Sequence, residues 1–172
     1  MKNMKAISLS LLMATNLIYS GIALSATGTV TLRDVDNGTC VLTAPEPGQT
    51  QIYSFVNEPV ACKDWNKKAR SIQFSELPSA TNIIVAANRN CWDSNDPNDF
   101  PWFKLKTIKK ITFTTILQIE NLASYSAGQI IQPGLQMIEL MKSNENGGNR
   151  DKISCVSITT SAVPPSSSTT TP

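Results

Sequence analysis

Short segments with β-strand character recur along most of this chain and constrain its fold more than any other feature. Several alternate apolar and polar residues, as at 30–32 and 72–74, and this period of two is typical of a half-buried strand. Turn-forming residues such as Asn37-Gly38 and Pro133-Gly134 separate the segments. The sequence therefore predicts an all-β fold, with a β-sandwich as its natural architecture. We expect strands at 29–33, 51–56, 71–74, 83–87, 111–117, 129–131, 135–141 and 153–159, and brief helices at 65–68 and 122–126.

The two ends of the chain have compositions of their own. Lys2 and Lys5 precede a largely apolar stretch that ends in small residues at Ala23 and Ser25, which is typical of a secretory signal peptide cleaved after Ser25. The stretch is interrupted by polar residues and no basic stop follows it, so a transmembrane anchor is disfavoured. We expect a signal peptide at 1–25, a β-sandwich domain at 26–160 and a disordered Ser/Thr/Pro tail at 161–172. The protein would then be secreted or periplasmic, with no membrane span in its mature form.

Composition excludes several kinds of function. The chain has no histidine, which excludes imidazole-based catalytic triads and His-ligated zinc. Of its 15 Lys and Arg residues, Lys2 and Lys5 belong to the signal, so 13 remain against 13 Asp and Glu. A mature net charge of zero gives no support to a nucleic-acid partner.

Four cysteines lie beyond the signal: Cys40, Cys62, Cys91 and Cys155. An even number of cysteines in an exported chain favours two disulfides, and three pairings are open. No two of the cysteines form a C-x-x-C pair and there is no histidine to assist them. A cysteine metal site and a catalytic cysteine are therefore disfavoured.

An internal repeat is the most informative pattern in the sequence. The segments 68–74, 107–113 and 152–158 superpose without gaps, and their starts are 39 and 45 residues apart. The stretches 29–40 and 81–91 are also alike, and each ends in a cysteine, Cys40 or Cys91. We expect about three similar units. The repeat favours the pairs Cys40–Cys62 and Cys91–Cys155.

The ends of these units carry a recognisable motif. Residues 150–155 resemble the Asx-Asx-x-x-Ser/Thr-Ser signature of the βγ-crystallin superfamily, and residues 66–71 keep its first Asn and final Ser. The resemblance implies a β-sandwich of Greek-key units and a motif whose polar residues help to hold calcium. Lys67 and Arg70 would repel the ion here, which leaves Asp151 and Ser154 as candidate ligands. We expect weak calcium binding or none, and no other cofactor.

Carboxylates crowd the segment 93–99, where Asp93, Asp96 and Asp99 stand among amide side chains. A calcium loop needs alternating oxygen ligands around a glycine hinge, but Pro97 occupies a ligand position. The segment is therefore expected to be a surface loop rich in Asx residues.

An aromatic and basic segment follows immediately. One interpretation is that its rings fill the core while its lysines protect a strand edge. The other is that Trp102 or Phe103 is exposed and binds a partner by stacking and cation–π attraction. Trp65, beside Lys63, Lys67 and Lys68, forms a similar second patch. The candidate binding residues are Trp102, Phe103, Lys104, Lys106 and Trp65.

Without a histidine base or a metal site, the sequence is interpreted as that of an exported, non-enzymatic protein that acts by protein–protein interaction. An inhibitor or a toxin- or virulence-associated factor is the expected type, and the resemblance permits the inhibitor role. One alternative is an extracellular hydrolase in which Asp93, Asp96 or Asp99 converges with Glu120 or Glu139. Another is a structural surface or fimbrial subunit.

Overall fold

The computed structural model describes residues 28–56, 62–93, 95–143 and 148–162. The predicted signal peptide at 1–25 and most of the predicted tail lie outside these residues. The regular elements within them are almost all strands, so the all-β prediction is confirmed. Two short helical turns complete the described elements: α1 (Ile119–Leu122) and a 3₁₀ turn (Pro97–Asp99).

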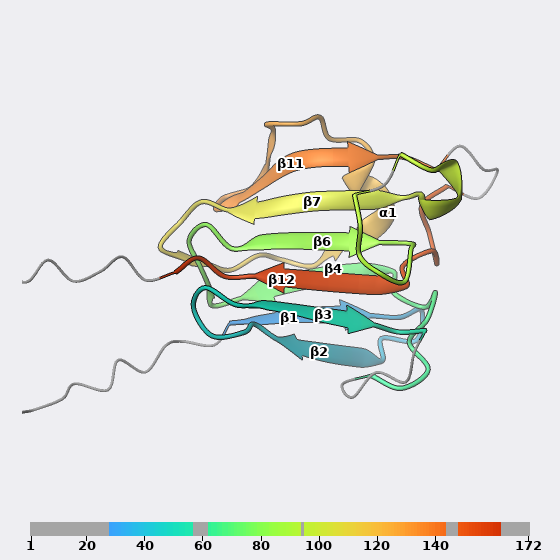
Figure 1. Cartoon of the computed structure of the whole chain (residues 1–172), viewed down its shortest axis with the longest axis horizontal. Helices are drawn as coiled ribbons and strands as arrows, with labels where there is room; N and C mark the ends of the chain where they lie inside the picture. Colours follow the sequence, from blue (N-terminus) through green and yellow to red (C-terminus); the bar gives the residue numbers. More distant parts are fainter. Residues whose placement is uncertain (1–27, 57–61, 94, 144–147, 163–172) are drawn as a thin grey trace, which may run out of the picture.

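The strands form a sandwich-like arrangement of antiparallel sheets (Figure 1). The four-stranded sheet has the order β2-β1-β4-β9, formed by β1 (Thr29–Arg33), β2 (Thr39–Thr43), β4 (Ser71–Ser75) and β9 (Leu117–Gln118). The six-stranded sheet has the order β10-β11-β7-β6-β12-β3, formed by β3 (Thr50–Ser54), β6 (Asn82–Ala86), β7 (Trp102–Thr107), β10 (Ile130–Gln132), β11 (Leu135–Met141) and β12 (Cys155–Thr159). A small third sheet pairs β5 (Leu77–Pro78) with β8 (Ile111–Thr112).

The strand order divides the chain into two halves of similar connectivity. In the first half, β1 and β2 pair, β3 crosses to the six-stranded sheet, and β4 returns to lie beside β1. In the second half, β6 and β7 pair, β9 crosses to the four-stranded sheet, and β12 returns to lie beside β6. The crossing strand of each half therefore pairs with the returning strand of the other. The hairpin β10–β11 widens the six-stranded sheet beyond β7.

Equivalent backbone contacts precede the two returning strands. Arg70, just before β4, donates its N–H to the carbonyl of Arg33 at 2.8 Å, and Ser154, just before β12, donates to that of Ala86 at 2.9 Å. The carbonyls of the same two residues accept from the ends of the crossing strands, Arg70 from Ile119 and Ser154 from Phe55, both at 2.8 Å. The sequence segments 68–74 and 152–158 thus lead into equivalent strands. The segment 107–113 instead spans the end of β7, a bend and β8.

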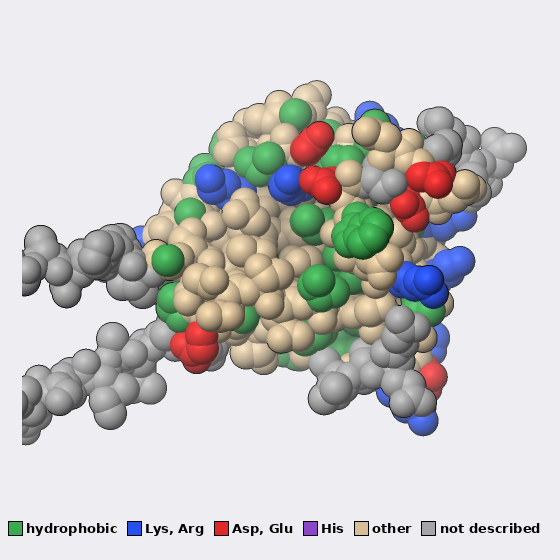
Figure 2. Space-filling view, in the orientation of Figure 1, with side chains coloured by type: hydrophobic (Ala, Val, Ile, Leu, Met, Phe, Trp, Pro, Cys, Tyr) green, Lys and Arg blue, Asp and Glu red, His purple; other side chains and the backbone are tan. Residues whose placement is uncertain are grey.

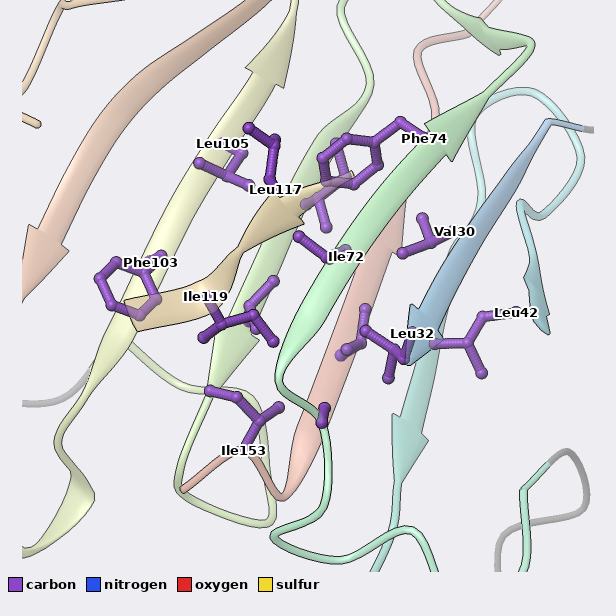
Figure 3. Packing of buried hydrophobic residues seen from close by; sticks show 14 of the residues in the cluster. Val30, Leu32, Leu42, Ile72, Phe74, Phe103, Leu105, Leu117, Ile119 and Ile153 are labelled. Carbon is purple, nitrogen blue, oxygen red and sulfur yellow. The ribbon is translucent and has the colours of Figure 1, made fainter. Parts of the chain in front are cut away.

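Apolar side chains from both large sheets form one core. Figure 3 shows residues of β1, β2 and β4 pointing into the same interior as Phe103 and Leu105 of β7. The alternation in β1 and β2 produces this directly, because every second side chain of each strand is buried.

Not every predicted element is observed. β1 and β11 have the predicted bounds, but β2 and β7 were not predicted as strands. The predicted strand 111–117 is divided into β8 and β9 by an irregular stretch. The predicted helix at 65–68 is a series of turns, and the helix predicted at 122–126 lies earlier, as α1.

Both predicted disulfides are present. Cys40 pairs with Cys62, with 5.7 Å between their Cα atoms, and Cys91 pairs with Cys155, with 5.3 Å. Two disulfides fit an oxidising environment. Among the described residues, no helix has the length and hydropathy that crossing a bilayer would require.

The sandwich has two distinct ends. Both disulfides lie at the end where β6 finishes and β7 begins, which we call the disulfide end. The first and last described residues, Gly28 and Ala162, lie at the opposite end, which we call the terminal end (Figure 1). There Ser161 donates a hydrogen bond to the carbonyl of Ala80 at 2.9 Å, and Gly28 lies against the backbone of Glu76 and Leu77.

Candidate functional site

The predicted aromatic pair is part of the interior. Trp102 is 2% exposed and Phe103 is fully buried, so the expectation that one of them is exposed is wrong. The reason is the position of β7, which pairs with β6 on one side and with β11 on the other. The interpretation that the rings fill the core holds for Phe103, which belongs to the core cluster, whereas Trp102 lies on the opposite face of β7 and is buried outside that cluster.

The lysines of the same segment do not protect a strand edge, because β7 is an internal strand. Lys104 and Lys106 are half-buried, and Lys104 makes an ion pair with Asp93, its Nζ lying 3.1 Å from Oδ2. Trp65 is also partly buried and packs against the core. The structure therefore does not bring the predicted binding residues together into one exposed patch.

A different tryptophan is exposed. Trp92 follows Cys91 in the connection between β6 and β7, and 64% of its surface is accessible, the largest exposed fraction among the exposed large hydrophobic residues. On the outer face of the six-stranded sheet most side chains are uncharged, with hydrophobic ones among them, and charged side chains lie over its upper part and toward its ends (Figure 2).

The turn that carries Trp92 is held by covalent and polar contacts. The disulfide ties the preceding Cys91 to the first residue of β12. The side chain of Asn88 accepts a hydrogen bond from the N–H of Trp92 at 3.0 Å and donates one to its carbonyl at 2.8 Å. The N–H of Asn90 also bonds to the Asn88 side chain, at 3.2 Å. The backbone of Trp92 is therefore fixed before any partner binds, which lowers the entropy lost on binding.

A charged pair follows directly. The hydrogen bond from Lys104 lowers the pKa of Asp93 below its ordinary value, so this carboxylate is ionised at neutral pH. A general acid for glycoside cleavage needs a raised pKa instead. The environment of Asp93 is therefore not that of such a general acid.

The rest of the acidic segment is a surface turn, as predicted. The side chain of Asp96 accepts a hydrogen bond from the N–H of Asn98 at 2.9 Å, and its carbonyl accepts one from Asp99. Asp96 thus caps the 3₁₀ turn at Pro97–Asp99. In the described part of the chain, no cluster of three or more carboxylate or cysteine side chains is arranged to hold a metal ion.

The candidate calcium ligands lie near a charged hollow of about 360 Å³ at the disulfide end. Asp151 receives two hydrogen bonds from Arg70, from Nε to Oδ1 at 2.9 Å and from Nη2 to Oδ2 at 2.8 Å. A guanidinium therefore occupies both of its oxygens. Ser154 is 2% exposed. The lining residues are Asp34, Val35, Asp36, Lys67, Lys68, Arg70 and Asp151.

No family model, curated protein or solved structure matches this chain. The site must therefore be interpreted from its own chemistry. Trp92 was not among the residues selected from the sequence, although an aromatic residue that follows a cysteine and lies among Asn and Asp residues is a signal for a ring presented on a polar turn. The aromatic residues at 102–103, which gave the stronger signal in the sequence, are both buried.

Proposed function

We propose that this chain is an exported, non-enzymatic binding protein that engages a protein partner through the turn carrying Trp92. One observation supports this most: a large indole ring is left in solvent on a turn that a disulfide and two side-chain hydrogen bonds hold in place. Tryptophans are enriched among the residues that dominate binding energy at protein interfaces.

The surroundings of Trp92 favour recognition of a protein. Asp93, the residue after Trp92, forms an ion pair with Lys104, and a polar rim around an aromatic anchor is the usual composition of a protein interface. Export is supported by the two disulfides, which persist in oxidising compartments. An inhibitor or a toxin-associated factor fits such a protein, because either acts by occupying a partner.

We also propose that the two halves are Greek-key units of βγ-crystallin type, two in number. The exchange of β3 and β9 between the sheets and the matched contacts of Arg70 and Ser154 support this proposal. Lys67 and Asp151 also hold equivalent places before the returning strands, and both have left-handed backbone conformations, with φ of 57° and 51°. Calcium is not expected to bind, because Arg70 holds the carboxylate of Asp151.

The hydrolase alternative has less support. Asp93 pairs with Lys104, whereas Glu120 pairs with Arg150 at 2.6 Å. Asp93 and Glu120 are thus each paired with a cation, and Asp96 caps its own turn.

The test is a comparison of the oxidised wild-type protein with Trp92→Ala and Ile52→Ala variants. Ile52 is a matched control, because it is 50% exposed and belongs to β3 rather than to the turn that carries Trp92. Each protein is used to capture partners from periplasmic and host-cell extracts, and the captured protein is then purified and titrated calorimetrically. We expect Trp92→Ala to weaken binding at least about thirtyfold, the effect of losing roughly 2 kcal/mol at an aromatic anchor.

Thermal unfolding of the variants distinguishes loss of a contact from loss of the fold. Both variants should unfold within a few degrees of the wild type, because neither side chain is buried. Equal affinity of the wild type and the Trp92→Ala variant would place the binding site elsewhere on the molecule.

A further inference from the structure

The segment 111–116 shows an inverted burial pattern. Thr112 and Thr114 are buried, whereas Ile111 and Phe113 are 47% and 59% exposed. A strand beside a core normally has the opposite arrangement, because a shift of one residue would exchange the two faces. Ile108 and Ile116, which flank this segment, are also about half exposed. Burying threonine and exposing isoleucine and phenylalanine is unfavourable for an isolated domain.

Specific hydrogen bonds maintain this inversion. The Thr112 hydroxyl donates to the carbonyl of Gly134 at 3.2 Å, and the Thr114 hydroxyl accepts from the N–H of Phe74 at 3.0 Å. The backbone N–H of Thr114 also donates to the carbonyl of Phe74, at 3.0 Å. The threonines are thus held inward at both sheets, and the apolar side chains between them must face outward.

These side chains border a hollow of about 480 Å³ at the terminal end. Gln132 fixes its opposite wall to the segment, since its side chain donates to the Thr115 hydroxyl at 2.7 Å and accepts from the Thr115 N–H at 2.9 Å. The hollow is therefore formed before any ligand binds. Its lining residues are Lys109, Ile111, Phe113, Thr114, Thr115, Gln132 and Pro133.

The charge of this surface is positive. Lys109 lines the hollow, exposed Lys110 follows it, and neither forms an ion pair with any carboxylate in the described ranges. None of the described residues that line the hollow is a carboxylate, although Glu76 precedes β5, the partner strand of β8. The surface therefore combines exposed apolar side chains with uncompensated positive charge.

We infer that this hollow is a second docking site, for an acidic protein segment that inserts an apolar side chain between Phe113 and Pro133 and sets carboxylates against Lys109 and Lys110. Charge complementarity favours this occupant over a second copy of the chain, because two copies would bring their lysines together. The concave shape and the polar wall at Gln132 favour a side chain over a lipid surface. The hollow lies at the terminal end, where β7 finishes, whereas Trp92 lies at the disulfide end, where β7 begins.

The probe is a short soluble peptide in which phenylalanine alternates with glutamate. It is titrated into the ¹⁵N-labelled, oxidised protein while amide chemical shifts are recorded. Two matched peptides replace every glutamate by lysine or every phenylalanine by serine. The inference predicts shifts of the amides at 108–116 and 130–134 with the first peptide, and much smaller ones with the other two.

Charge-reversed variants test the role of the lysines. Lys109→Glu/Lys110→Glu should weaken binding of the glutamate peptide by about tenfold or more and improve binding of the lysine peptide. Lys63→Glu/Lys68→Glu makes the same charge change at exposed positions of the disulfide end and should leave the affinity unchanged. Trp92→Ala should also leave it unchanged, which separates this site from the one in the proposed function.

Four outcomes would overturn the inference. The peptide could leave the amides of 108–116 unshifted, or its binding could survive Lys109→Glu/Lys110→Glu. Phosphatidylglycerol vesicles could shift these amides where the peptide does not, which would indicate a membrane surface. Finally, sedimentation could show a dimer that Phe113→Ser dissociates, which would make the hollow a contact between copies.

Discussion

Two tryptophans only ten positions apart have opposite environments. Trp102 is almost completely buried in β7, and Trp92 is the most exposed of the large apolar side chains that face solvent. Whether an aromatic side chain of this segment is exposed therefore depends on which parts of the chain cover it. The difference also determines what each substitution should do to stability and to binding.

Replacement of Trp102 by alanine should lower the free energy of unfolding by about 3–5 kcal/mol, because it leaves a large cavity in a packed interior. Replacement of Trp92 should change it by less than about 0.5 kcal/mol. Urea unfolding followed by circular dichroism measures both values. A Trp92→Ala loss as large as that of Trp102→Ala would mean that the Trp92 ring is part of the core.

The Asp93–Lys104 pair should make a small, pH-dependent contribution. A depressed carboxyl pKa adds stability above the ordinary value of Asp, about 3.9, and this stability is lost as the pH falls through the depressed value. Both side chains are partly exposed, so we expect Asp93→Asn to cost no more than about 0.5 kcal/mol at pH 7.

The difference between wild type and Asp93→Asn should shrink as the pH falls below 3.9. Thermal unfolding at pH 7, 4 and 2.5, with an Asp36→Asn control outside this pair, provides the measurement. A difference that grows on acidification would contradict the depressed pKa.

At the scale of elements, the stretch between β8 and β9 shows the limit of pattern analysis. Its alternation of apolar residues and threonine is correct for a strand, but the threonines face inward. The register is fixed by contacts with Phe74 and Gly134, which come from two different sheets. Period-two alternation identifies a strand face but does not say which face meets the core.

The turn between β10 and β11 should be sensitive to a single methyl group. Gly134 has a φ of 102°, and an added Cβ would lie 3.2 Å from Lys109 Cδ and from Thr112 Oγ1. Gly134→Ala should therefore cost about 1–3 kcal/mol. Gly128 is a matched control with a φ of 83° and no atom within 4 Å of the added Cβ.

In Gly128→Ala, only the positive φ is unfavourable for the new residue, so this variant should be the less destabilising of the two. Chemical unfolding of both variants gives the comparison. If Gly128→Ala were equally destabilising, crowding at the hollow would contribute nothing.

At the scale of the whole molecule, the two ends of the sandwich differ in what holds them. The disulfide end has both covalent links and the Arg70–Asp151 pair, which joins the starts of the two returning strands. At the terminal end, the described residues are joined by hydrogen bonds such as that from Ser161 to Ala80. Both proposed binding surfaces are thus supported by the fold, one at each end.

Loss of the Cys91–Cys155 disulfide should destabilise the protein more than loss of Cys40–Cys62. Cys91–Cys155 closes 64 residues and Cys40–Cys62 closes 22, so the chain-entropy model gives about 4 and about 3 kcal/mol respectively. Unfolding of the Cys91→Ser/Cys155→Ser and Cys40→Ser/Cys62→Ser proteins would measure the two values. The Cys91→Ser/Cys155→Ser substitutions should also weaken any binding through Trp92, because they free the turn that carries this residue. A larger loss of unfolding free energy from Cys40→Ser/Cys62→Ser would show that native contacts outweigh loop length.

The fold class and most strands follow from the sequence, because alternation and turn residues are local or periodic signals. Its repeated cysteine positions favour, among three possible pairings, the one that is observed. The sequence also located the equivalent starts of β4 and β12. Local patterns do not show that β7 is an internal strand, that Trp102 is buried and Trp92 exposed, or that Thr112 and Thr114 face inward. Each of these depends on which strands become neighbours, and neighbours distant in sequence leave no mark in a local pattern.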